Sequence, residues 1–82
     1  MTETEARQIL NAFFQKWLKP GEKIWIGDTY CSDPTGYSFW AGTYIPGDKA
    51  SSDFSIWAVD SATKNVAMEL IQNPRRPPAF PV

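Results

Sequence analysis

The chain has 82 residues, 43% hydrophobic and 21% charged, which is the composition of one small globular domain. Its net charge is −1, and without the two arginines of its proline-rich end it has six basic and nine acidic residues, a balance that argues against nucleic acid as a partner. One cysteine and no histidine exclude a fold that depends on internal disulfides and leave no imidazole for acid–base catalysis.

The first expected element is an amphipathic helix of about five turns, from TETEARQ to QKWLK. Thr2 and Glu5 have the spacing of a capping box, in which each side chain accepts a hydrogen bond from the backbone amide of the other. Pro20 and Gly21 are expected to end the helix. Its apolar stripe recurs at steps of three and four residues and comprises Ala6, Ile9, Leu10, Phe13, Phe14 and Trp17.

Three segments with a period of two follow, which predicts strands at 22–31, 37–45 and 53–59. SDPTG between the first two is short enough for a hairpin, whereas PGDKASS suits a longer, mobile loop. VAMELI is expected to be a fourth strand, with a helical turn as the alternative. The fold class is therefore α+β, with the helix packed on a three- to four-stranded antiparallel meander formed within residues 1–73.

Residues 74–82 form a proline-rich tail, which we expect to be extended and near polyproline II geometry. Arg75, Pro78 and Pro81 stand at R-x-x-P-x-x-P spacing, which would suit an aromatic-lined groove. The alternative is a tail that is disordered or packed on its own domain.

Alternation within the strands predicts two apolar sheet faces, although a solvated face should be polar. One is expected to collect Ile24, Ile26, Tyr30, Tyr37, Phe39, Ile45, Phe54 and Ile56, and the other Trp25, Trp40, Tyr44, Trp57 and Val59. We assign the helix to the first face. The alternative places it on the tryptophan face, where Gly27 and Gly42 would allow close approach. The uncovered face would then bind a partner, form a homodimer or lie under the tail, unless bulges redistribute the faces.

Candidate chemistry is sparse. Cys31 is expected to be a buried or half-buried structural thiol. The aspartates stand at strand ends and in turns, where they cap local amides. No spacing matches a metal, cofactor or nucleotide site, so we expect no catalytic residues, metal or cofactor.

The segments ARQILNAFFQKW, YSFWAGTY and SIWAVDSATKNV resemble the small bacterial immunity domains of polymorphic toxin systems, in which a helix is followed by a cystatin-like sheet. The resemblance covers about residues 5–71. It implies a cystatin-like fold and a non-catalytic role, the binding of a cognate toxin in the cytoplasm. Members often have glycine in the turn where this chain has SATKN, and the tail has no counterpart in them.

We therefore expect a non-catalytic protein-binding module, an immunity protein or inhibitor. We place it in the cytoplasm, or on an export route that needs no cleaved signal, because no signal-peptide or membrane-spanning run is found. Its partner would be another protein or a second copy of the chain, and not a membrane. The anchors would be Trp25, Trp40, Tyr44 and Trp57, with Asp48, Lys49 and Asp60 as rim charges. The alternative is a small ligand-binding or enzyme-accessory subunit with a pocket lined by the same rings.

Overall fold

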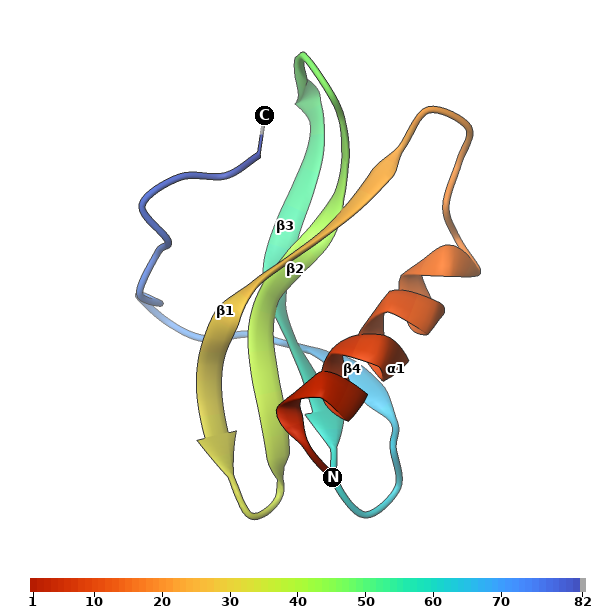
Figure 1. Ribbon diagram of the computed structural model, residues 1–82. Helices are drawn as coiled ribbons and strands as arrows, with labels where there is room; N and C mark the ends of the chain where they lie inside the picture. Colours follow the sequence, from red (N-terminus) through yellow and green to blue (C-terminus); the bar gives the residue numbers. More distant parts are fainter. Residues whose placement is uncertain (82) are drawn as a thin grey trace.

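A computed structural model describes residues 1–81 as one helix on a four-stranded antiparallel sheet (Figure 1). The elements are α1 (Glu3–Gln15), β1 (Lys23–Asp33), β2 (Gly36–Ile45), β3 (Asp48–Asp60) and β4 (Val66–Glu69). The strands pair in chain order, β1-β2-β3-β4. The predicted α+β meander is confirmed, and VAMELI contributes a fourth strand.

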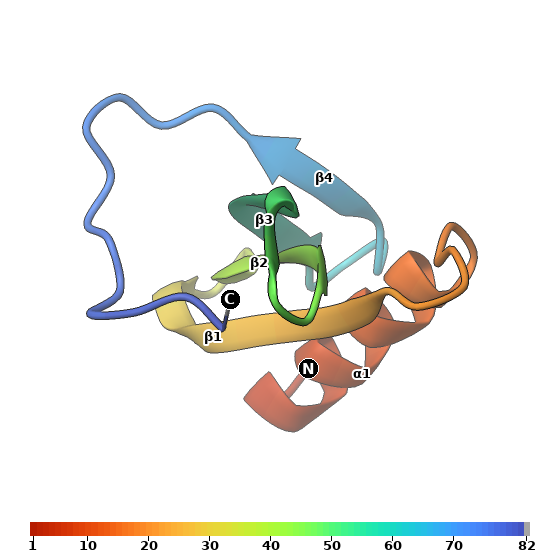
Figure 2. The same cartoon turned by 90° about the horizontal axis from the view of Figure 1, so that it is seen from above.

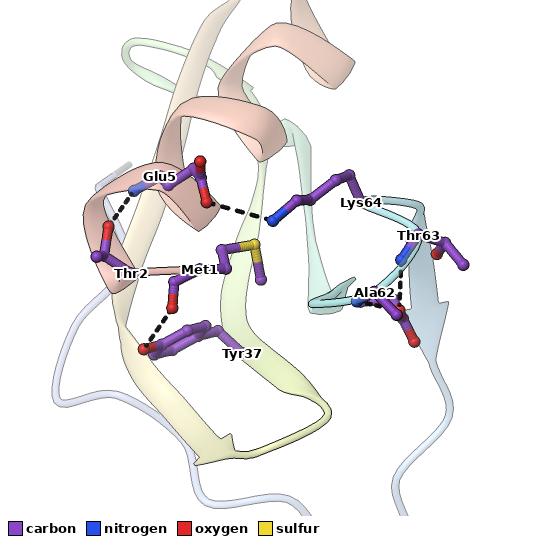
Figure 3. A network of polar contacts seen from close by, with 8 residues as sticks. Met1, Thr2, Glu5, Tyr37, Ala62, Thr63 and Lys64 are labelled. Carbon is purple, nitrogen blue, oxygen red and sulfur yellow. Dashed lines mark hydrogen bonds and ion pairs between the residues drawn. The ribbon is translucent and has the colours of Figure 1, made fainter.

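The helix begins as its sequence predicts. The Thr2 side chain caps it by accepting a hydrogen bond of 3.1 Å from the Glu5 amide. The Glu5 carboxylate lies 3.4 Å from the ammonium of Lys64, in the β3–β4 turn, so this end of the helix is tied to the sheet (Figure 3). The Tyr37 hydroxyl adds a 3.4 Å hydrogen bond to the carbonyl of Met1 (Figure 3).

The end of the helix differs from the prediction, because α1 stops at Gln15 and Trp17 lies outside it. The Lys16 and Trp17 amides bond to the carbonyls of Phe13 and Phe14, three residues back, which tightens the last turn. This rotates Trp17 off the apolar stripe, and its side chain is 71% exposed. The expectation that Trp17 packs in the core is therefore wrong.

The core lies between α1 and one face of the sheet. Ala6, Leu10 and Phe14 of the helix pack on Phe39, Ala41 and Val59 of the central strands. Ile24 and Ile26 of β1 pack against this cluster. For β1 and β2 the helix therefore covers the predicted aliphatic and phenylalanine side. The opposite side of the sheet is called the outer face below.

The register of β3 differs from the prediction and changes which side chains share a face. Phe39 pairs with Trp57, and Trp40 pairs with Ile56. Directly opposed residues of an antiparallel pair lie on the same face, so Trp57 and Val59 belong to the helix side while Phe54 and Ile56 lie on the outer face. The predicted sorting of these four residues is wrong.

A bulge causes this change. Between the pairs Thr43–Asp53 and Ile45–Asp48, β2 advances by two residues and β3 by five. An odd number of extra residues turns every later side chain of β3 to the other face. Two smaller irregularities, between Ile26 and Cys31, each add one residue to β1, so the first reverses the alternation and the second restores it. Tyr30, which lies between them, contacts the tail rather than the helix.

The β2–β3 connection is a tight turn at Pro46 and Gly47, so the expected long loop is wrong. Gly47 has φ of +81°, and proline followed by a glycine of positive φ is the pattern of a type II turn. The polar residues after it form the bulged part of β3. Asp48 accepts hydrogen bonds from the Ala50 amide (3.1 Å) and the Ser51 hydroxyl (2.8 Å).

Candidate functional site

The tail crosses the outer face of the sheet. After β4 the chain has no further helix or strand up to residue 81, and Asn73 bends it with φ of +51°. Figure 2 shows the tail arching away from β4 and returning to β1, on the side of the sheet opposite α1. Of the three predicted solutions for the second apolar face, the tail folded back is the observed one.

Phe80 is the main apolar contact of the tail. Its ring stacks on Phe54 with 4.9 Å between centroids and 6° between planes. It meets Trp25 and Trp40 edge-on, at 5.5 and 5.6 Å. Phe80 is half-buried, and Trp40 is only 9% exposed. We name Trp25, Trp40, Tyr44 and Phe54 the outer aromatic cluster; Tyr44 joins it through Phe54 at 6.1 Å.

Arg75 holds the tail at a second point. Its carbonyl accepts a hydrogen bond of 2.6 Å from the indole nitrogen Nε1 of Trp40. Its guanidinium donates to the Tyr30 carbonyl at 2.5 Å and lies 4.5 Å from the centroid of the Tyr30 ring. The Arg76 guanidinium lies 5.8 Å from the centroid of the Trp40 ring. The Phe80 ring, the Arg75 carbonyl and the guanidinium groups of Arg75 and Arg76 thus hold the segment.

Trp57 does not belong to this cluster. Its ring lies 5.5 Å from Phe13 and 5.2 Å from Phe14, so it packs under the helix. Phe54 takes its predicted place on the outer face. The bulge in β3 is what places Phe54 on the outer face instead of Trp57. The one sequence feature that could have indicated this bulge is the polar run DKASS after Pro46–Gly47.

The predicted rim charges do not gather around the cluster. Asp48 and Lys49 start β3 and Asp60 ends it, so they stand at opposite ends of a 13-residue strand. Asp48 is engaged within its own bulge. Asp60 closes the β3–β4 turn, where it accepts hydrogen bonds from the amides of Ala62 (2.8 Å) and Thr63 (2.9 Å) (Figure 3).

These amides lower the pKa of Asp60 below its ordinary 3.8, with Thr63 contributing more than Ala62. The folded state therefore favours the carboxylate. Its contribution to stability is complete above the unfolded-state pKa and is lost as the pH falls through the lower folded-state value.

We expect Asp60→Asn to lower the free energy of unfolding at pH 7, because a neutral amide oxygen accepts more weakly than a carboxylate. The gap between the variant and the wild type should begin to narrow near pH 4, where the carboxyl of the unfolded wild-type chain takes up a proton, and should close as the pH falls through the lower folded-state pKa. Urea denaturation of both chains from pH 7 to pH 3 measures this. A gap that stays constant or widens with acid would contradict it.

A hollow remains beside the tail. It has a volume of about 420 Å³ and is lined by Trp40, Phe54, Ser55, Ile56, Glu69, Leu70, Ile71, Gln72 and Pro74. Leu70 is 92% exposed, so the chain that leaves β4 does not close over the outer face. The tail therefore covers the aromatic cluster without filling the whole face.

Residues 1–81 contain no group of three or more potential metal ligands. Cys31 is exposed, and the expectation of a buried or half-buried thiol is wrong because it lies near the end of edge strand β1. In the same part of the chain, no helix is long and apolar enough to cross a membrane.

Comparisons with protein-family models, curated proteins and solved structures find no match to this chain. The similarity to toxin-immunity domains stays a prediction from the sequence.

Proposed function

We propose that the chain is a non-catalytic protein-binding module that recognises a segment of a partner protein on its outer aromatic cluster, in competition with its own tail. The observation that supports this is the position of Phe80. One side chain from an irregular segment sits among the rings of Trp25, Trp40 and Phe54, as a peptide anchor sits in a receptor.

The tail is held by side-chain contacts and a carbonyl contact and not by strand pairing, which supports exchange with a partner. No strand pairing joins it to the sheet within residues 70–81, and its residues are at most half-buried. Local segments with few buried contacts open at low free-energy cost. The face beneath is rich in tryptophan and tyrosine, which dominate interface binding energies.

An immunity protein or inhibitor is the form of this function that the family resemblance implies, with the toxin as the partner and the cytoplasm as its location. The ligand-binding alternative has less support, because the group that lies among these rings is the side chain of a peptide segment, Phe80. A second copy of the chain is the other partner that this face could take.

The proposal is tested by capture from extracts of the producing cells with three immobilised chains: wild type, Phe80→Ala, and Phe80→Ala with Phe54→Ala. Removing the Phe80 ring should open the face, so recovery of the partner should rise severalfold. Removing Phe54 as well should lower it again, because the floor of the site is lost. Quantitative mass spectrometry measures recovery.

Trp17→Ala is the matched control, since it removes an exposed apolar side chain that lies outside the cluster. Its recovery profile should equal that of the wild type. Circular dichroism must show that all the chains are folded. If no protein rises with Phe80→Ala and falls with the added Phe54→Ala, the aromatic cluster is not a binding site.

A further inference from the structure

The exposure of the tail has a period of three. Ile71, Pro74, Pro77 and Phe80 are half-buried, and the two residues between each neighbouring pair are exposed. A polyproline II helix has three residues per turn, so every third side chain lies on the same edge. Bends at Asn73 and Pro78 bound the stretch in which this period can reflect polyproline II geometry, which is Pro74 to Pro77, and Phe80 reaches the sheet after the second bend.

The half-buried residues of the tail match the R-x-x-P-x-x-P pattern only at Pro81. Arg75 and Pro78 are exposed, and the buried edge begins one residue earlier, at Pro74. Arg75 instead contributes its carbonyl, to Trp40, and its guanidinium, to Tyr30. The half-buried residues Pro74, Pro77 and Phe80 have the spacing P-x-x-P-x-x-F.

The hydrogen bond from Trp40 fits this backbone. A polyproline II segment has no internal hydrogen bonds, so its carbonyls are free to accept. An indole is a donor only, and Nε1 of Trp40 meets the Arg75 carbonyl at 2.6 Å. Aromatic grooves recognise proline-rich segments by this combination of ring contacts and a carbonyl contact.

We infer that the partner segment for this face is a proline-rich segment with P-x-x-P-x-x-F spacing, polyproline II between its two prolines, which the tail imitates in the isolated chain. This inference rests on the proposed function and names its ligand. The partner's phenylalanine enters the outer aromatic cluster, and its backbone accepts from Trp40. An arginine after the first proline stacks on Tyr30, as Arg75 does.

Tethering explains why the tail occupies the site and why a partner can replace it. A short linker gives the tail a local concentration of about millimolar, so modest contacts suffice to hold it. The same linker, leaving β4, does not fill the hollow of about 420 Å³ between Ile56 and Leu70. A separate partner segment has no such tether and can extend into that space.

A fluorescent peptide with the sequence of residues 71–82 tests the inference by anisotropy, with the full chain as receptor. It should bind Phe80→Ala about tenfold more tightly than the wild type, because the internal competitor is weakened. Adding Trp40→Phe, which keeps a ring but removes the indole N–H, should reduce binding severalfold. Peptides with alanine for Phe80, or for both Pro74 and Pro77, should bind about tenfold or more weakly.

The peptide controls keep the test independent of receptor folding. Equal binding of the peptide without its two prolines would overturn polyproline II recognition and leave only an aromatic anchor. Sedimentation of the wild type and Phe80→Ala tests the competing occupant, and a dimer that disappears with Phe80→Ala would assign the face to a second copy. If no peptide binds while the capture experiment succeeds, the ligand class is wrong and the protein-binding function stands.

Discussion

A chain with Trp57→Ala is expected to lose about 3 kcal/mol of unfolding free energy, the lower end of the cost of truncating a large aromatic core residue. The indole packs on Phe13 and Phe14 of the helix, and it pairs with the fully buried Phe39 across the sheet. Its removal leaves a cavity under α1. Urea denaturation monitored by far-ultraviolet circular dichroism measures the loss.

The matched control is Trp17→Ala, the same substitution at a side chain that is 71% exposed. It should change the free energy of unfolding by no more than about 0.5 kcal/mol. If Trp57→Ala were as mild as Trp17→Ala, Trp57 would be a surface residue and its initial assignment to a partner-binding face would be correct.

Gly42→Ala is expected to destabilise the chain by about 3 kcal/mol or more, because overpacking that the backbone cannot relieve lies at the high end of such costs. A Cβ atom at this position would lie 1.8 Å from the carbonyl oxygen of Asp53. Close approach at Gly42 thus involves the neighbouring strand β3, and not the helix as the alternative interpretation of the sequence required. The substitution forces β2 and β3 apart beside the bulge.

Gly27→Ala is the control for this effect. Its Cβ would lie 2.7 Å from the tip of the Trp25 ring, and a side chain can move where a backbone carbonyl cannot. We expect a loss of about 1 kcal/mol, together with a shift in tryptophan emission. Equal losses for the two variants would show that β3 can yield at Asp53 and would contradict the close approach of the two strands.

Most of the fold could be predicted from local sequence. Thr2 caps the helix because its hydroxyl can accept from the Glu5 amide, and the stripe from Ala6 to Phe14 needs only helical periodicity. Period two marks the strands, and Pro34 marks the first hairpin. Each of these features depends on residues that are close together in the sequence, so the sequence alone is enough to predict it.

The candidate site was only partly predictable. Trp25, Trp40 and Tyr44 were expected on one face and do lie together, because they belong to β1 and β2 stretches that pair as the alternation predicts. Trp57 was expected with them and Phe54 was not, because the phase between two strands depends on the bulge near Thr43. The alternation of side chains within one strand does not show how that strand is aligned with its neighbour, so it cannot reveal a shift in their pairing.

The sequence by itself determined that this chain has one amphipathic helix, a meander of strands and more apolar sheet surface than the helix can cover. Only the tertiary structure decided how that surface is divided and covered: a bulge exchanges Trp57 for Phe54, and Phe80 crosses the molecule to pack on the outer face. The physical reason is the separation in sequence of the residues whose contacts decide each feature. Caps, turns and periodicity are set by neighbours along the chain, whereas register and tail docking are decided by contacts between residues far apart in sequence.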